Sequence, residues 1–270
     1  MSTISIIGAG RVACGLARAA VESGHTVLHT GSRDAGDAEK LSKIVGAEVM
    51  PAPFFQAAEA DILFLTVPDR EIAPVAEDLA AMPLSWEGIT VFHTSGAIPA
   101  AVLEPLAEKG AVTGSFHPLQ TFPPGAGPDR FQGIYVALEG EAADTGAELA
   151  ESFGAYSFRI SPENKTSYHL AAVAVSNFTT GLLTMGRELF RRAGLPGEND
   201  WRMLLPLVRG TVQSLEEYGI EGALSGPVAR GDAETVEKHL QALESNKDIQ
   251  NLYRALSKVL LEIPILPTQD

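Results

Sequence analysis

The sequence is poor in cysteine and in basic residues. Cys14 is the one cysteine among 270 residues, so no intramolecular disulfide can form, and we expect a reducing, cytoplasmic location. Lysine and arginine number 20 against 34 aspartates and glutamates, which gives a formal net charge of −14. This balance argues against nucleic acid as a partner and against an anionic membrane surface. A small anionic ligand is not excluded, because a local pocket can carry its own positive charge.

Long apolar runs and a leader-like N-terminus are also missing. Residues 1–7 have neither the basic segment nor the long apolar segment of a signal peptide. The longest mostly apolar stretch, residues 170–185, is broken by serine, asparagine and threonine and is too polar to span a membrane. Apolar residues still make up 45% of the chain, which is enough for one large folded domain or two modest ones.

The first 160 residues alternate short apolar runs with helical patterns. Strands are predicted at 3–7, 26–30, 62–67, 89–93, 112–116, 134–138 and 156–160. Helices are predicted at 11–23, 37–45, 72–81, 99–109 and 142–153. This alternation predicts an α/β fold over residues 1–160, a Rossmann-type, doubly wound and mainly parallel sheet with helices on both faces.

Residues 161–270 show no strand pattern. Ser161 and Pro162 favour a helix start, and that helix is predicted to run to about residue 193. Further helices are predicted at 200–218, 232–243 and 248–262, with Asp232 as an N-cap. The second part of the chain is therefore predicted to be an all-α domain.

The strongest local motif is a glycine turn between the first strand and the first helix. It has the form G-x-G-x-x-A, in which Gly8 permits a tight turn and Gly10 lets the backbone approach a pyrophosphate. Arg11 and Val12 begin the helix, and Ala13 lets that helix pack close to the sheet. The motif predicts a dinucleotide site, with the N-terminus of the helix facing the phosphates.

The end of the second strand lacks the carboxylate that usually binds the ribose of NAD. Ser32 and Arg33 stand there instead, and Asp34 follows the arginine. A hydroxyl and a guanidinium suit a 2′-phosphate, so NADP is expected as the cofactor. The alternative for Arg33 is a solvated cation in a loop.

Two further segments follow predicted strands and are expected to line the cofactor crevice. Val67 ends the buried third strand and Pro68 follows it, and Ser95 and Gly96 follow the fourth strand. In doubly wound sheets the ligand lies beyond the carboxyl ends of the strands. Either segment can also be a plain turn.

Two histidines end neighbouring strands at the same crevice. His93 is followed by small residues, and His117 is followed by a proline-rich loop in which Gln120 and Thr121 offer neutral hydrogen-bonding groups for a substrate. Each histidine is a candidate acid or base, and for each a structural role is equally open. The spacing of the histidines does not match a metal site, so no metal is expected.

The long helix after residue 161 carries a polar stripe. Lys165, His169 and Ser176 recur at helical spacing on an otherwise apolar helix. Lys165 and His169 are candidates for an acid and an anion anchor, and Ser176 for a substrate contact. A solvent-facing stripe is the alternative. The sequence does not decide which residue exchanges a proton with the substrate. The candidates are Lys165 and His169 on this helix and His93 and His117 at the strand ends.

A further loop, residues 224–232, contains Gly-Pro and Arg-Gly turns. Arg230 in this loop is a candidate clamp for a substrate carboxylate. A purely structural role of the loop is the alternative.

Four motifs together resemble a known family. They span residues 8–13, 93–96, 116–122 and 225–232 and occur in this order across nearly the whole chain. They look like the bacterial Rossmann-like proteins with a C-terminal helical domain of unknown function, which are commonly labelled NADP oxidoreductases of the deazaflavin-dependent type. More distantly, the layout is similar to β-hydroxyacid dehydrogenases, pyrroline-5-carboxylate reductases and ketopantoate reductases.

The resemblance implies residue roles and an assembly. In the hydroxyacid dehydrogenases a catalytic lysine lies on the helix after the Rossmann domain, and Lys165 matches it by placement. His169 stands where that family has an asparagine, which puts the hydroxyacid reaction in doubt. The helical domain of such relatives commonly forms a dimer, so a homodimer through residues 161–270 is expected.

The expected function is hydride transfer between NADP(H) and a small, anionic substrate in the cleft between the domains. A non-catalytic, NADP-binding regulator is the alternative. Hydride transfer between a deazaflavin and NADP is a third possibility, which rests on the family label alone.

Overall fold

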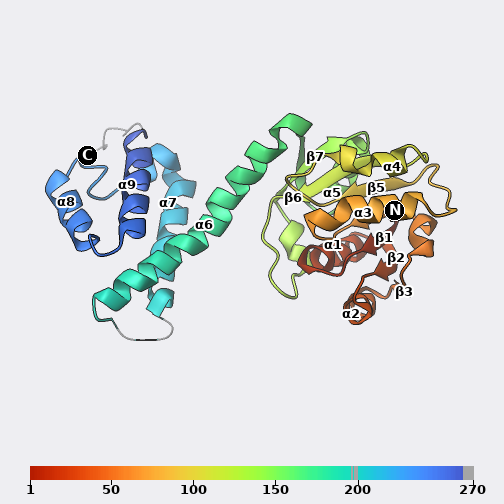
Figure 1. The fold of residues 1–270 in the computed structure, drawn as a ribbon, viewed down its shortest axis with the longest axis horizontal. Helices are drawn as coiled ribbons and strands as arrows, with labels where there is room; N and C mark the ends of the chain where they lie inside the picture. The colour runs from red at the N-terminus through yellow and green to blue at the C-terminus, as the bar shows by residue number, and fades with distance from the viewer. Residues whose placement is uncertain (196, 198–199, 264–270) are drawn as a thin grey trace. The chain divides into compact units, whose positions relative to one another are not determined.

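The computed structural model describes residues 1–195, 197 and 200–263. Its contacts divide the chain into two compact units, Met1–Ser176 and Asn177–Asp270, each of which is described by itself (Figure 1). The last strand ends at Arg159, and the sequence predicts the domain boundary after residue 160. The division by contacts comes later, inside the long helix α6 (Lys165–Arg192), so the first unit includes the first turns of that helix.

One sheet of eight strands forms the centre of the first unit. The strands are β1 (Thr3–Ile7), β2 (Thr26–Gly31), β3 (Glu48–Met50), β4 (Ile62–Leu65), β5 (Thr90–His93), β6 (Val112–Pro118), β7 (Tyr135–Gly140) and β8 (Tyr156–Arg159). Their order is β3-β2-β1-β4-β5-β6-β7-β8. All neighbouring pairs are parallel except β6 with β7, which is antiparallel. The predicted α/β fold with a mainly parallel sheet is confirmed.

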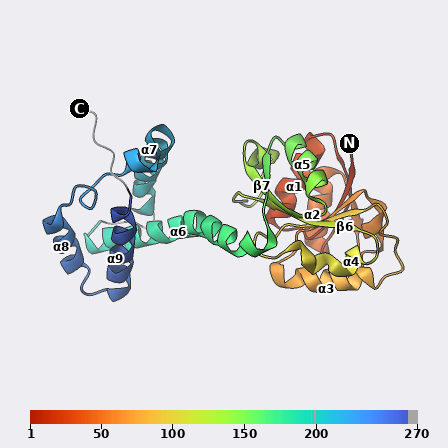
Figure 2. The ribbon, with the colours of Figure 1, turned by 90° about the horizontal axis from the view of Figure 1, so that it is seen from above.

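Helices cover both faces of this sheet. They are α1 (Arg11–Glu22), α2 (Ala35–Val45), α3 (Asp69–Ala80), α4 (Glu104–Ala107) and α5 (Ala143–Ser152), with short 3₁₀ helices η1 (Phe55–Glu59), η2 (Ala100–Leu103), η3 (Pro128–Phe131) and η4 (Pro162–Asn164). Figure 2 shows α1 and α5 on one side of the sheet and α3 and α4 on the other.

Alternating side chains of the central strands fill two separate cores. Phe64 and Phe92 lie on the α1 and α5 side with their rings 5.3 Å apart, and Phe116 packs edge-on against both. Leu65 and Val91 point the other way, into the core under α3 and α4. Every residue of β4 and β5 is buried, and β4 accordingly reads as a continuous apolar run in the sequence.

Two details of the first unit differ from the prediction. The single helix predicted at 99–109 is wrong: η2 and α4 stand there instead, because Pro105 has no N–H to donate to the carbonyl of Ala101. The short strand β3 was not predicted. Its three residues lie beside Pro51 and pair only with β2, so they are too few to show a period in the sequence.

The second unit contains helices and connecting turns, with no strand among its described residues. It contains the rest of α6, the 3₁₀ helix η5 (Asp200–Leu204), α7 (Leu205–Ala223), α8 (Ala233–Ala242) and α9 (Lys247–Leu261). The predicted N-cap of α8 is confirmed, since the Asp232 carboxylate accepts a hydrogen bond from the Thr235 N–H. Helix α7 is interrupted at Gly219, whose φ is 72°. In the parts of the chain that the structure describes, no helix is long and apolar enough to cross a membrane.

Candidate functional site

The glycine turn after β1 is held between the ends of the neighbouring strands. The Gly8 N–H donates to the Gly31 carbonyl at the end of β2 (2.7 Å), and the Thr66 N–H donates to the Ile7 carbonyl (2.8 Å). The φ of Gly8 is 108°, and a Cβ there would lie 2.6 Å from the Thr66 carbonyl oxygen. Only glycine fits this position, because both the backbone angle and the space exclude a side chain.

The second glycine leaves the start of α1 open. Gly10 is the N-cap of α1 and provides no side-chain cap, and a Cβ on Gly10 would meet nothing within 4 Å. The first N–H groups of α1 are therefore available to a phosphate, which the helix dipole also favours. Arg11 is exposed at the first position of α1, Val12 is half-buried, and Ala13 is buried against the sheet. This open cradle fits the pyrophosphate of a dinucleotide.

The carboxylate nearest the end of β2 already has a role. Asp34 is the N-cap of α2, and its Oδ1 accepts hydrogen bonds from the N–H groups of Gly36 (2.9 Å) and Asp37 (3.3 Å). Its backbone N–H donates to the Ser32 hydroxyl (3.3 Å). The Arg33 side chain is 83% exposed, with its Nη1 3.6 Å from Glu71 Oε2. Ser32 and Arg33 thus offer a donor set that fits a 2′-phosphate, whereas Asp34 is occupied.

The segments that follow β4 and β5 lie at the same edge of the sheet. Val67 is half-buried against the core, and Pro68 is exposed at the N-cap position of α3. The Ser95 hydroxyl is buried and donates to Asp69 Oδ2 (3.0 Å) while it accepts from the Ala97 N–H (3.2 Å). Ser95 therefore fixes its own turn, and its hydroxyl is not free to face a ligand.

Gly96 makes room for His117. A Cβ on Gly96 would lie 2.8 Å from Nε2 of that histidine. The glycine that the sequence places in the cofactor crevice is thus needed for packing between the turn after β5 and the end of β6.

Lys165 joins α6 to the sheet in a buried polar cluster. Its side chain is 1% exposed, and its Nζ donates to Ser115 Oγ (2.7 Å) and lies 3.9 Å from Glu139 Oε2. A longer bond of 3.4 Å reaches the Ser95 carbonyl. Burial lowers the pKa of Lys165, and the charges of Glu139 and Asp69 oppose that effect. The lysine side chain therefore has protein partners and no exposed face.

The sheet register explains how this cluster forms. His93 pairs with Ser115, and Ser115 pairs with Glu139, so the three side chains lie in one row across β5, β6 and β7. His93 is fully buried, and its Nδ1 accepts from the Ser95 N–H (3.1 Å). Burial, and secondly the charge of Lys165, lower the pKa of His93 to about 3. His93 is thus neutral at physiological pH.

His117 belongs to a more open group. Its Nδ1 shares a hydrogen bond of 2.6 Å with the Tyr168 hydroxyl, and its ring lies 6.3 Å from that of His169. Burial, followed by the charges of Lys165 and His169, lowers the pKa of His117 to about 4. Burial raises the pKa of Tyr168 to about 12. His117, Tyr168 and His169 are all half-buried, so they keep some exposed surface.

Tyr168 was missed from the sequence. It lies three positions after Lys165, on the same side of α6, and this spacing is the signal that could have revealed it. Ser115 and Glu139 were missed as well, because their roles depend on the strand register. Asp69 at the start of α3, which accepts from the Ser95 hydroxyl, was also missed.

The remaining predicted residues belong to other elements of the two units. Gln120 and Thr121 are exposed in the loop after β6, where Gln120 Oε1 accepts from the Thr121 N–H (2.7 Å). Ser176 is half-buried on α6 at the end of the first unit, and Arg230 is exposed in the second unit between α7 and α8. Within the described ranges, no group of three or more histidine, cysteine, aspartate or glutamate residues is placed to hold a metal ion.

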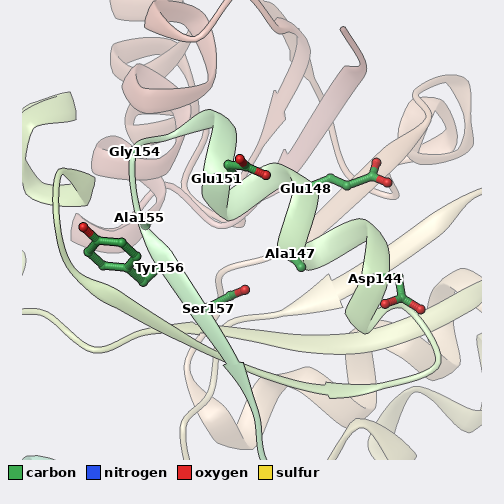
Figure 3. Close-up of a pocket in the computed structure, with 8 residues that line it drawn as sticks. All are labelled: Asp144, Ala147, Glu148, Glu151, Gly154, Ala155, Tyr156 and Ser157. Atoms are coloured by element: carbon green, nitrogen blue, oxygen red, sulfur yellow. The ribbon is translucent and has the colours of Figure 1, made fainter.

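A pocket also opens between α5 and β8, outside the predicted site. Figure 3 shows the side chains of Asp144, Glu148 and Glu151 on α5 above β8, with Tyr156 at the start of the strand. Asp144 also pairs with Arg159. None of the predicted site residues lines this pocket, and its carboxylates would repel an anionic cofactor.

The fold and the open glycine cradle define a dinucleotide-binding type of domain joined to a helical domain. Residues 2–118 match the Rossmann-like domain, and residues 134–260 match a domain of unknown function, DUF2520. The chain therefore combines a Rossmann-like domain with a DUF2520 domain, and the Rossmann-like domain fits NADP binding. Among curated proteins none matches the chain.

Solved structures resemble the chain over almost its whole length. One is a protein from Bacteroides fragilis, provisionally designated an NADP oxidoreductase, with 28% identity, a TM-score of 0.78 and coverage of 97% of this chain and 98% of that one. A protein from Thermotoga maritima has 25% identity, a TM-score of 0.74 and coverage of 96% and 97%.

A reductive aminase from Aspergillus terreus, in complex with NADPH and ethyl-5-oxohexanoate, has 18% identity, a TM-score of 0.66 and coverage of 96% of this chain and 92% of that one. At that identity the likeness concerns the fold alone. Together with the two domain matches, these structures confirm the resemblance that the four sequence motifs indicate.

Proposed function

We propose that the protein is an NADP-dependent oxidoreductase that transfers a hydride between NADP(H) and a small, anionic substrate. The open cradle carries the proposal: Gly8 tolerates no side chain, Gly10 faces open space, and Asp34 is occupied by its helix cap. The protein from Bacteroides fragilis, provisionally designated an NADP oxidoreductase, supports the same class of activity.

The chain's own residues would hold the dinucleotide at three places. The first N–H groups of α1, together with Arg11, bind the pyrophosphate, and Ser32 with Arg33 binds the 2′-phosphate. Val67 and Pro68 form the apolar wall beyond β4. When bound, the nicotinamide supplies or accepts the hydride.

Reduction of a carbonyl or imine also needs a proton at the acceptor atom. We assign this task to His117 together with Tyr168, because their hydrogen-bonded pair keeps exposed surface, and His169 lies beside it. Lys165 and His93 are positioning residues in this proposal. Both are buried, and both hold the backbone of the turn that contains Ser95 and Gly96.

The anionic nature of the substrate is a separate part of the proposal. Its support is the exposed Arg230 in its shaped loop. Lys165 has no exposed face and adds only its charge near the His117 group. Gln120, Thr121 and Ser176 remain the proposed neutral contacts. A panel of keto acids, uncharged ketones and cyclic imines would test this part, with NADPH oxidation as the readout.

The cofactor assignment is tested first by binding. We expect NADPH to bind the full-length protein at least about tenfold more tightly than NADH, because charge-assisted bonds to the 2′-phosphate are lost with NADH. Equal affinities would contradict NADP as the cofactor. Full turnover of a substrate by the Lys165→Ala and His117→Ala variants would contradict the assigned site.

A non-catalytic, NADP-binding protein is the second candidate. The complete burial of His93 and Lys165 favours it, because both side chains are engaged by protein groups. One measurement distinguishes the two candidates. A non-catalytic protein would bind NADPH, but no member of the substrate panel would lead to NADPH oxidation.

We also propose a homodimer formed through the helical domain. Leu207, Ile220 and Val259 are large apolar side chains on α7 and α9, and each is exposed in the described second unit. Such surfaces are typical of an interface between copies. Light scattering of the purified chain, over a range of concentrations, tests this proposal.

A further inference from the structure

One carboxylate bridges two arginines next to the glycine turn. Glu71 Oε2 lies 3.6 Å from Arg33 Nη1, and Glu71 Oε1 accepts a hydrogen bond of 3.2 Å from Arg70 Nε. Arg33 follows β2, whereas Arg70 and Glu71 belong to the first turn of α3, which follows β4. Because β2 and β4 flank β1, the pair of Arg33 with Glu71 joins the segments on the two sides of the glycine turn.

The three side chains differ in how freely they can move. Arg33 and Arg70 are 83% and 82% exposed, whereas Glu71 is 30% exposed. Exposed ion pairs are weak and exchange partners readily. A phosphate carries more negative charge than a carboxylate and has three acceptor oxygens, so it is a stronger partner for the Arg33 guanidinium.

We propose that Glu71 competes with the 2′-phosphate of the cofactor for Arg33, and that Arg70 retains the Glu71 carboxylate when the phosphate binds. Glu71 and Arg70 then set the preference for NADP(H) over NAD(H), although neither needs to touch the phosphate. This inference rests on the proposed function, because it requires the 2′-phosphate to bind at Arg33. Both residues are positioning residues for Arg33.

The charges give the direction of each effect. Without the Glu71 carboxylate, Arg33 is free in the unliganded protein, so NADPH no longer displaces a partner and binds more tightly. Without Arg70, the Glu71 carboxylate keeps Arg33 as its one arginine partner among these three side chains. It then competes more strongly with the 2′-phosphate for Arg33, so NADPH binds less tightly. NADH has no phosphate at this position, so its affinity changes little in either variant.

The experiment measures the dissociation constants of NADPH and NADH for the full-length protein by nicotinamide fluorescence at low ionic strength. The variants are Glu71→Gln, Arg70→Ala and the double variant. Glu77→Gln removes a charge from an exposed position further along α3, and Arg159→Ala removes one on β8, at the opposite edge of the sheet from β2. These two variants are the matched controls.

We expect Glu71→Gln to tighten NADPH binding about two- to fivefold, as an exposed ion pair allows, and Arg70→Ala to weaken it by a similar factor. NADH binding and both controls should change less than about 1.5-fold, because NADH has no 2′-phosphate for Arg33 to bind and neither control residue pairs with Arg33, Arg70 or Glu71. In the Glu71→Gln background, Arg70→Ala should have no further effect, because Arg70 acts through Glu71.

Three results would overturn the inference. The first is weaker binding of NADPH or NADH by Glu71→Gln, which would mean that the carboxylate itself binds the ribose. Equal changes for both cofactors, or none for either, remove Glu71 from cofactor selection. A further loss from Arg70→Ala in the Glu71→Gln background shows that Arg70 contacts the phosphate directly. If wild-type protein binds neither cofactor, the proposed function itself fails, and this result is distinct from the other three.

Discussion

The two compact units differ in how they bury their apolar residues. The first unit closes two cores around its sheet, and side chains such as Phe64 and Leu65 in one strand are fully buried on opposite faces. In the described second unit, Leu240 and Leu243 are the buried apolar residues, while Leu207 and Val259 remain exposed. The first unit therefore closes its cores with its own residues. The helical half has apolar surface that a partner would cover.

The largest expected effect comes from breaking the buried polar cluster of the first unit. Lys165→Met leaves the Glu139 carboxylate buried without its cation, so we expect the free energy of unfolding to fall by about 3–5 kcal/mol. Urea denaturation measures this change. Lys109→Met, which removes an exposed lysine, is the control and should cost less than about 0.5 kcal/mol. A small loss at Lys165 would show that the cluster does not support the first unit.

Gly8→Ala should cost about 2–3 kcal/mol, because the new Cβ meets the Thr66 carbonyl in a backbone conformation that alanine disfavours. Gly10→Ala is the matched variant, since its Cβ meets no protein atom within 4 Å. Thermal unfolding should therefore separate the two variants. NADPH titration should show weak binding in both, because the Gly10 methyl group would occupy the cradle itself. Unchanged binding in Gly10→Ala would place the pyrophosphate elsewhere.

Acidification should destabilise the first unit. The pKa of His93 is about 3 and that of His117 about 4, both below the ordinary 6.5, so below pH 6.5 the unfolded chain binds protons that the folded chain does not. The free energy of unfolding is therefore highest above pH 6.5. As the pH falls toward 4, each of the two histidines lowers it by about 1.4 kcal/mol per pH unit. Urea denaturation at several pH values measures the slope. It should be shallower in His117→Phe and unchanged in His239→Gln, an exposed histidine of the second unit.

Arg33→Ala should weaken NADPH binding about tenfold, which is about 1.4 kcal/mol, and leave NADH binding within twofold. The folded state should be unaffected, because the Arg33 side chain is largely exposed. Isothermal titration with both cofactors measures the difference. If Arg33→Ala weakened NADPH and NADH binding equally, Arg33 would contribute to binding of both dinucleotides and would not contact the 2′-phosphate.

The smallest effect on folding is expected in the second unit. Leu207→Ser and Val259→Ser remove exposed side chains, so the free energy of unfolding of the isolated chain should change by less than about 0.5 kcal/mol. The apparent mass by light scattering should nevertheless fall toward the monomer if these faces form the dimer. Val21→Ser on α1, also exposed, is the control. An unchanged mass would move the interface away from α7 and α9.

The sequence was informative where local rules decide the structure. The turn at Gly8, the cap at Asp232 and the continuous apolar run of β4 follow from the backbone angle, from helix termini and from burial on both faces. These features need no knowledge of distant residues. The helix predicted at 99–109 failed for a local reason too, since Pro105 could have signalled the break.

The site depended on contacts that no local rule provides. Ser95 and Lys165 look like ligand-facing residues in the sequence, yet both are buried and engaged within the protein. The helical spacing from Lys165 could have pointed to Tyr168, but its hydrogen bond to His117, fifty-one positions away, could not be predicted from the sequence. Whether a polar side chain faces solvent or the core is decided by strand register and by where α6 begins.

The cap of α2 has an evolutionary consequence. Asp34 stabilises the start of that helix by about 1 kcal/mol, and the same carboxylate is the one nearest the end of β2. A descendant of this chain that adopted NAD would need a new carboxylate at the strand end or a new cap for α2. Under the proposed cofactor assignment, a single substitution at Arg33 would abolish the preference for NADP(H) without creating one for NAD(H).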